Sequence, residues 1–284
     1  MINQSIKSAR KYISDKLSSI YPREEVSALT KIILLETTDL SATELLAESG
    51  RQLTANTWDK IKKICAELKD KRPIQYILGK TDFYGLELKV NKHTLIPRQE
   101  TEELVDLIIR ENKSPGLKVL DIGTGSGAIA IALCLNLLEP GVSATDISED
   151  ALKIARENCI MHKCKIVFKK NNILENRPLR KEMLDIVVSN PPYVRESEKG
   201  SMHDNVLDYE PHSALFVPDS DPLKYYRAIG NSAMLLLKPG GSIYLEINEA
   251  LSNETGDLIS EIGFNSISII RDLNNKDRIL KAHR

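Results

Sequence analysis

The stretch that decides the fold is LKVLDIGTGSG, residues 117–127. Its apolar first half predicts a buried strand, and the glycines at alternate positions of its second half predict a sharp turn into a helix. Glycine lets a backbone turn tightly and approach a ligand without a Cβ in the way. The stretch therefore predicts a strand, a ligand-binding turn and a helix in succession.

Strands and helices alternate on the C-terminal side of this stretch. Because crossovers between parallel strands are right-handed, such alternation predicts an α/β fold with a parallel sheet covered by helices on both faces. A turn at Asn274-Asn275-Lys276-Asp277 joins the last two strands and predicts a closing antiparallel hairpin. The expected strands are 117–123, 142–147, 165–170, 184–190, 242–247, 266–272 and 278–284; the expected helices are 101–111, 126–138, 149–162, 222–237 and 249–262.

The sequence before residue 98 has a different periodicity. Apolar residues recur at helical spacing as far as about residue 72, and Ser41 with Glu44 forms a capping-box pattern. From Tyr76 to Pro97 the pattern changes to two short strands punctuated by glycine, which predicts a hairpin. We therefore expect a helical domain at 1–75, a β-hairpin linker at 76–97 and an α/β domain at 98–284.

Composition limits the possible functions. The 284 residues include 39 Lys and Arg against 40 Asp and Glu, a formal net charge of −1, which is unlike a protein that coats nucleic acid by neutralising phosphate. Residues 1–80 hold 14 basic and 10 acidic side chains, leaving 25 basic and 30 acidic for the remainder. We therefore expect any basic contact surface in the N-terminal quarter.

The cysteines and histidines indicate a protein with reduced thiols and no metal site, and the apolar runs indicate no membrane span. The four cysteines form no C-x-x-C pair and the five histidines are scattered, so we expect free thiols and no metal site. No apolar run approaches the roughly 20 residues that cross a bilayer, and the first thirty residues lack the apolar core and small-residue cleavage site of a signal peptide. The expected location is the cytoplasm, with no membrane association.

The glycine turn and two acids fit a nucleoside ligand without phosphate. Glycines at 123, 125 and 127 do not match the dinucleotide fingerprint, and no phosphate-binding lysine follows them. Asp146, at the end of the second strand, can accept hydrogen bonds from ribose hydroxyls, and Asp121 can face an ammonium group. This set fits S-adenosylmethionine; the alternative is that each aspartate caps a helix. The candidate cofactor residues are Asp121, Gly123, Thr124, Gly125, Ser126, Gly127 and Asp146.

A second motif, Asn190-Pro191-Pro192-Tyr193, ends the fourth strand. Ligands bind at the carboxyl ends of strands in open parallel sheets. The Asn190 side-chain carbonyl and the Pro191 backbone carbonyl can each accept a hydrogen bond from a planar –NH₂ group, and Tyr193 can stack on it. Two such acceptors stabilise the positive charge that grows on nitrogen as it attacks a methyl sulfonium. Asn190, Pro191 and Tyr193 are the candidate catalytic residues.

Essentially the whole chain resembles the HemK/PrmC family of protein-glutamine N5-methyltransferases. The resemblance implies a seven-stranded, Rossmann-like class I methyltransferase domain, S-adenosylmethionine as cofactor and S-adenosylhomocysteine as product. It also implies methylation of the glutamine in the Gly-Gly-Gln motif of class I peptide-chain release factors, a protein modification that tunes translation termination. The matching stretches are residues 72–79 and 95–98, Thr101-Glu102, residues 121–127 and 190–193, Glu210-Pro211 and Ala214-Leu215.

The resemblance assigns further site residues. It adds Asn172, Ile173 and Asn190 to the cofactor site and places the substrate glutamine against residues 190–193, with Pro97 and Arg98 beside the substrate entrance. Family members often have an aspartate where this chain has Asn172, whose carbonyl can still accept a hydrogen bond from the adenine amino group. From the residues alone, Arg98 could instead pair with Glu102.

Two other functions remain open at this point. The first is an adenine-N6 or guanine-N2 methyltransferase that acts on nucleic acid, because an NPPY motif can also bind the amino group of a nucleobase. The acidic catalytic region argues against this function. The second is a non-catalytic binder that keeps the cofactor fold. We expect a monomer that needs no nucleic acid and contacts the body of a release factor through its N-terminal helices.

Overall fold

A computed structural model describes residues 4–175 and 183–284. These residues divide into two compact units: one reaches Leu78 and also includes Asp204–Tyr209, and the other comprises Gly79–His203 and Glu210–Arg284. The first unit thus extends beyond the predicted boundary at residue 75 and gains a segment from the distant α/β region. The predicted hairpin linker belongs mostly to the second unit.

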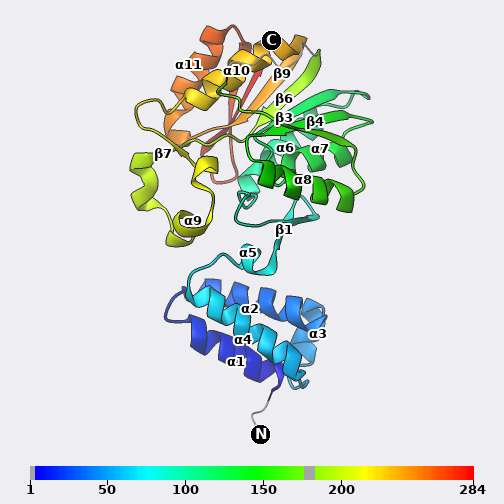
Figure 1. Ribbon diagram of the computed structural model, residues 1–284, viewed down its shortest axis with the longest axis vertical. Coiled ribbons are helices and arrows are strands. Elements are labelled where there is room, and N and C mark those ends of the chain that lie inside the picture. The colour runs from blue at the N-terminus through cyan, green and yellow to red at the C-terminus, as the bar shows by residue number, and fades with distance from the viewer. Residues whose placement is uncertain (1–3, 176–182) are drawn as a thin grey trace. The chain divides into compact units, whose positions relative to one another are not determined.

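The first unit is helical throughout (Figure 1). Its apolar residues are buried at helical spacing, and the capping box is confirmed because Ser41 accepts from the Glu44 amide while Glu44 accepts from the Ser41 amide. Asp204–Tyr209 is held to it by an ion pair from Lys71 to Asp204 and by the Tyr209 hydroxyl, which donates to the Asp70 carbonyl at 2.6 Å. The helices are α1 (Ile6–Leu17), α2 (Arg23–Thr38), α3 (Ala42–Ala47), α4 (Ala55–Lys69), α5 (Ile74–Leu78) and α9 (Asp204–Tyr209).

The second unit contains a seven-stranded sheet in the order β10-β11-β9-β6-β3-β4-β5. β9, β6, β3, β4 and β5 are parallel, whereas β11 is antiparallel to both β9 and β10. The predicted strands and the closing hairpin are therefore confirmed. The bounds are β3 (Lys118–Ile122), β4 (Gly141–Asp146), β5 (Ile166–Lys170), β6 (Leu184–Ser189), β9 (Leu237–Glu246), β10 (Asn265–Arg271) and β11 (Asp277–His283).

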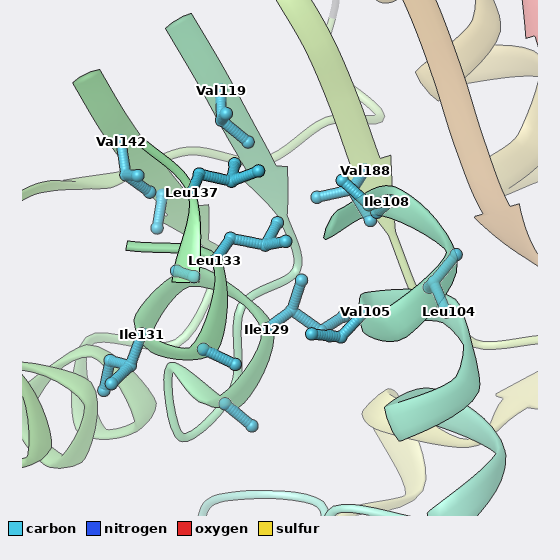
Figure 2. Packing of buried hydrophobic residues seen from close by; sticks show 14 of the residues in the cluster. Leu104, Val105, Ile108, Val119, Ile129, Ile131, Leu133, Leu137, Val142 and Val188 are labelled. Atoms are coloured by element: carbon cyan, nitrogen blue, oxygen red, sulfur yellow. The ribbon is translucent and has the colours of Figure 1, made fainter. Parts of the chain in front are cut away.

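Helices cover both faces of this sheet because its strands are apolar on both sides (Figure 1). Val119 of β3 packs on one face with α6, α7 and α8, whereas Leu120, the next residue, packs on the other with α10 and α11. Figure 2 shows Leu137, the C-cap residue of α7, beside Val119, with Leu133 of the same helix next to Leu137, in the first of these two cores. The bounds are α6 (Gln99–Glu111), α7 (Ala128–Asn136), α8 (Glu149–Met161), α10 (Lys224–Leu236) and α11 (Ser252–Ile262).

Smaller elements complete the second unit. The hairpin of β1 (Lys80–Phe83) and β2 (Leu86–Lys89) is confirmed, and it buries Phe83 and Leu88 in the core on the α7 face. Within the described ranges, every helix is too short or too polar to span a lipid bilayer. The sequence did not predict β7 (Val194–Arg195), η1 (Glu196–Ser201), η2 (His212–Ala214), β8 (Phe216–Val217) or η3 (Glu249–Leu251).

The order of the strands reverses at β3. From β3 the chain proceeds outward through β4 and β5 and then returns to β6 on the opposite side of β3. Such a reversal leaves a crevice at the carboxyl ends of the two strands, where ligands of open α/β sheets bind. The glycine turn follows β3 and the NPPY motif follows β6, so both motifs open on this crevice.

Two leucines on α7 offer a matched test of the core. Leu133 is fully buried, whereas Leu135 is 44% exposed. Leu133→Ala should lower the free energy of unfolding by about 2–5 kcal/mol, because it removes buried methyl groups and leaves a cavity. Leu135→Ala should change it by less than about 0.5 kcal/mol. Urea denaturation measures both, and equal losses would contradict this packing.

Candidate active site

The glycine turn after β3 uses its three glycines in two ways. All three have left-handed φ angles, +76° at Gly123, +56° at Gly125 and +84° at Gly127. A Cβ on Gly127 would lie 3.2 Å from the Ala155 Cβ, so this glycine lets α7 start close to α8. No atom lies within 4 Å of a Cβ built on Gly123 or Gly125, and both residues line a cavity. The first two glycines therefore leave open backbone beside that cavity.

The cavity lies at the carboxyl ends of β3, β4 and β6 and has a volume of about 260 Å³. Eight of its lining residues were predicted as site residues, whereas others come from the segments 92–95 and 211–214 and from α10. The lining residues are Lys92, His93, Thr94, Leu95, Ile122, Gly123, Gly125, Asp146, Ile147, Ser148, Ala151, Asn171, Asn172, Ile173, Ser189, Asn190, Pro191, Pro192, Pro211, Ser213, Ala214, Tyr225 and Ile229.

Asp146 presents a held carboxylate to this cavity. Its Oδ2 accepts from the Gly125 amide at 2.8 Å and its Oδ1 from the Ser148 amide at 2.9 Å, so each oxygen keeps a second acceptor site. Burial raises the pKa of Asp146 although these amides lower it. The α8 cap is Ser148, which accepts from the Ala151 amide, so the helix-cap interpretation of Asp146 is wrong. Two adjacent acceptors suit a vicinal diol.

Asp121 lies beneath the turn and is completely buried, so it is not part of the cavity wall. The Thr124 hydroxyl donates to its Oδ2 at 2.6 Å, whereas its Oδ1 has no hydrogen-bond partner among the described residues. Burial raises the pKa of Asp121 to about 7, and the charge of Asp146 adds to the rise. A nearby cation would relieve both unfavourable effects. Gly127 is the N-cap residue of α7, but the backbone of Ala130, in the first turn of that helix, lowers the pKa of Asp121, so Asp121 also interacts with the start of α7.

Thr124, Ser126 and Gly127 also lie behind the cavity wall. Thr124 and Ser126 are buried, and the Ser126 carbonyl accepts from the Asn158 amide group of α8 at 2.9 Å. They do not line the cavity, whereas Gly123 and Gly125 line it directly, and a contact of these three residues with a cofactor stays a prediction.

The region beyond β4 and β5 gives the cavity a mixed apolar and amide surface. Ile147 lines it while 54% exposed, and Asn171, Asn172 and Ile173 lie on the same wall. Asn172 Oδ1 already accepts from the Leu174 amide at 3.1 Å, which leaves one acceptor site for an amino group. Ile147 and Asn171 were not predicted; position directly after a buried strand is the signal that could have indicated them.

Asn190 enters the cavity wall with its amide group already oriented. Its Nδ2 donates to the Thr101 hydroxyl at 3.0 Å, and Thr101 donates to Glu246 Oε2 at 2.7 Å. Within the described part of the chain, no donor occupies Asn190 Oδ1 or the Pro191 carbonyl. Pro191 and Pro192 line the same wall. Two acceptors on adjacent residues are therefore available to a ligand.

Tyr193 is held through its hydroxyl group. Its hydroxyl donates to Glu246 Oε1 at 2.9 Å, its backbone carbonyl accepts from Asn248 at 3.1 Å, and it does not line the cavity. Burial and the charge of Glu246 raise the pKa of Tyr193. The ring is thus tied to the sheet through its hydroxyl, and stacking on a substrate –NH₂ group stays a prediction.

Pro97 and Arg98 also lie outside the cavity wall. Arg98 forms an ion pair with Glu210, whose other oxygen accepts from the Ile96 amide at 3.1 Å. Glu102 instead accepts from the Tyr84 amide, so the pairing of Arg98 with Glu102 is wrong. The Glu210 side chain is almost completely buried. Its contacts with Ile96 and Arg98 hold residues 96–98 against the segment that follows NPPY.

The residues present fit S-adenosylmethionine. The open backbone of Gly123 and Gly125 suits its charged amino-acid part, and the unpaired Asp121 carboxylate oxygen beneath this turn favours positive charge there. The Asp146 carboxylate suits its ribose diol. The exposed Ile147 side chain offers an apolar surface to adenine. No group of three or more His, Cys, Asp and Glu side chains able to hold a metal ion occurs in the described ranges.

Comparisons with solved structures support the fold. A methyltransferase from Pyrococcus furiosus aligns with a TM-score of 0.53 at 18% identity, over 81% of this chain and 98% of that chain. The 16S rRNA N2 G1207 methyltransferase of T. Thermophilus, solved with AdoMet and guanosine, aligns with a TM-score of 0.52 at 18% identity, over 72% of this chain and 49% of that chain. The fold is that of class I S-adenosylmethionine-dependent methyltransferases.

Comparisons of sequence identify the family. Residues 8–79 match the PrmC N-terminal domain and residues 101–208 the methyltransferase small domain. The release factor glutamine methyltransferase of Flavobacterium psychrophilum is 43% identical over 98% of this chain and 99% of that protein. The protein of the same name from Bacteroides thetaiotaomicron is 43% identical over 96% and 98%. This chain belongs to the family of release factor glutamine methyltransferases.

Proposed function

We propose that this enzyme transfers a methyl group from S-adenosylmethionine to the side-chain amide nitrogen of the glutamine in the Gly-Gly-Gln motif of class I release factors. Its membership of the family supports the substrate. The single observation that carries the chemistry is the pair of free acceptors, Asn190 Oδ1 and the Pro191 carbonyl, in the wall of the cavity. A primary amide has two N–H donors that match this pair.

The pair of acceptors addresses the main chemical difficulty. An amide nitrogen is a poor nucleophile because its lone pair is delocalised into the carbonyl. S-adenosylmethionine, when bound, supplies a methyl group on a positively charged sulfur. Asn190 and Pro191 hold both N–H bonds of the substrate amide and stabilise the positive charge that develops on its nitrogen as the new bond forms. Both acceptors are preorganised, since Asn190 is fixed by Thr101 and Pro191 by its ring.

The first unit offers a surface for the body of the release factor. A groove runs between α1 and α2. Its lining residues are Arg10, Ser14, Ser18, Tyr21, Arg23, Val26, Ser27 and Thr30. Residues 1–80 also hold more basic than acidic side chains, 14 against 10, whereas the rest of the chain holds more acidic ones. We propose that this groove contacts the protein substrate, that the enzyme acts as a cytoplasmic monomer, and that it needs no nucleic acid.

Asn190→Ala should lower kcat about 100-fold or more, because it removes one acceptor from the substrate amide. The dissociation constant for S-adenosylmethionine should rise far less than kcat falls, because Asn190 is only one of the predicted cofactor residues and Asp146 and the glycine turn remain. Mass spectrometry of a release factor incubated with enzyme and cofactor measures the gain of one methyl group on the Gly-Gly-Gln peptide. Near-normal turnover by the variant would contradict the role of Asn190, and label entering RNA or DNA instead would favour a nucleic-acid substrate.

Asp146→Asn should raise the dissociation constant for S-adenosylmethionine about 10- to 100-fold, because it removes the charge from the acceptor of the ribose diol. Asp150→Asn is the matched control, since Asp150 is an exposed acid in the first turn of α8 that does not line the cavity. Isothermal titration calorimetry measures both. Equal effects would mean that general electrostatics rather than a direct contact governs affinity.

Arg23→Glu should raise KM for the release factor while leaving the dissociation constant for S-adenosylmethionine unchanged, because it reverses a charge in the groove of the first unit. An acid in the first turn of α2 also suits the helix dipole, so folding should be preserved. Lys60→Glu on α4 is the control for net charge, since Lys60 is exposed and outside the groove. An equal rise in KM for both variants would mean that net charge, and not a contact at the groove, determines KM.

A further inference from the structure

We propose that Glu246 is a positioning residue that sets the direction of the Asn190 amide through Thr101 and holds Tyr193 with its second oxygen. The proposal rests on the proposed function for its catalytic consequence. Glu246 is the last residue of β9 and is only 1% exposed. It does not line the cavity, so it acts through the residues that it holds.

The direction of each hydrogen bond follows from counting protons. Glu246 in its ionised form, which the charge of Arg278 favours, can only accept, and Thr101 has one hydroxyl proton. That proton is donated to Glu246 Oε2 at 2.7 Å, so the Thr101 oxygen can only accept from Asn190. The group of Asn190 that lies 3.0 Å from Thr101 is therefore its –NH₂. The relay leaves the Asn190 carbonyl oxygen for the ligand.

The polarity of this relay matters to the chemistry. If the Asn190 amide were rotated by half a turn, its –NH₂ would replace its carbonyl and would face the substrate –NH₂ group. Two donors would then meet, and no acceptor would stabilise the charge on the substrate nitrogen. Asparagine alone does not prefer either direction, because its two amide ends have nearly the same shape. The buried carboxylate supplies the preference.

The second oxygen of Glu246 fixes the other end of the motif. Tyr193 donates to Oε1 at 2.9 Å, so one carboxylate is connected to both Asn190 and Tyr193, the first and last residues of NPPY. Thr101 lies 145 positions from Glu246 and Tyr193 lies 53 positions away. Three distant parts of the chain thus converge on one buried acid.

The residues around Glu246 are of two kinds: some contact its carboxylate, and one contacts only its backbone. Burial raises the pKa of Glu246, whereas the Thr101 and Tyr193 hydroxyls and the charge of Arg278 lower it. Tyr226 is also completely buried beside it, but its hydroxyl donates at 3.3 Å to the Glu246 backbone carbonyl and not to the carboxylate. Tyr226 therefore supports the same strand without entering the relay.

Thr101→Val and Glu246→Gln test the relay with almost no change of shape. Valine cannot pass the hydrogen bond from Asn190 to Glu246. Glutamine can accept from only one of the two hydroxyls and must donate to the other, which disturbs the relay or the Tyr193 contact. Both variants should lower kcat on the release factor about 10- to 100-fold with KM for S-adenosylmethionine unchanged.

Two further variants separate positioning from stability. Thr101→Ser keeps the hydroxyl and should retain most of the wild-type kcat. Tyr226→Phe removes a buried hydroxyl next to the same residue and should lower Tm while leaving kcat nearly unchanged. The proposal is overturned if Thr101→Val keeps wild-type kcat, if Thr101→Ser is as slow as Thr101→Val, or if Tyr226→Phe loses as much kcat as Glu246→Gln.

An NMR measurement decides the positioning role even without turnover. The side-chain –NH₂ protons of Asn190 should exchange slowly in the wild type and in Thr101→Ser, and faster in Thr101→Val, because only the last variant lacks the acceptor. Equal exchange in all three would overturn the relay. A wild-type enzyme that shows this protection but does not methylate a release factor would refute the proposed function while leaving the relay intact.

Discussion

The active site depends on the parallel pairing of β3 with β6. Ile122 and Ser189 are partners at the ends of these strands, and the buried Ser189 hydroxyl donates to the Ile122 carbonyl at 2.6 Å. Because paired strands lie about 4.8 Å apart, the residues that follow them, Gly123 and Asn190, begin their loops side by side. The cofactor turn and the amide-binding motif are thus neighbours through backbone geometry, before any ligand is bound.

Around this pairing the protein buries several acids at a cost in stability. Asp121 and Glu246 are completely or almost completely buried, and burial raises the pKa of both. Each accepts a hydroxyl hydrogen bond that offsets part of the cost, and apolar layers on both sheet faces supply the favourable free energy. The stability of the apolar layers therefore offsets the unfavourable burial of the acids that orient the site.

Sequence alone predicted what depends on local pattern. The apolar strand, the glycine turn and the NPPY motif could be found because each is contiguous, and the Ser41–Glu44 capping box could be found because its residues are three positions apart. The relay through Thr101 and Glu246 could not be predicted, because within an apolar strand Glu246 looks like an ordinary terminal acid and its partner is 145 positions away. The elements of segment 194–217 were not predicted for another reason, because its two-residue strands are too short to show periodicity.

The place of α9 has a consequence for folding during synthesis. Lys71 pairs with Asp204, 133 positions later, and Asp70 accepts from Tyr209, 139 positions later. Chains generally fold from the N-terminus as they leave the ribosome, yet these partners emerge only after most of the catalytic sheet has been made. The buried core of the helical unit is formed by residues 6–74 alone, and α9 buries none of its residues, so the helical unit can fold before α9 is made. Docking of α9 on that unit then requires that the catalytic strands up to β6 have already been synthesised.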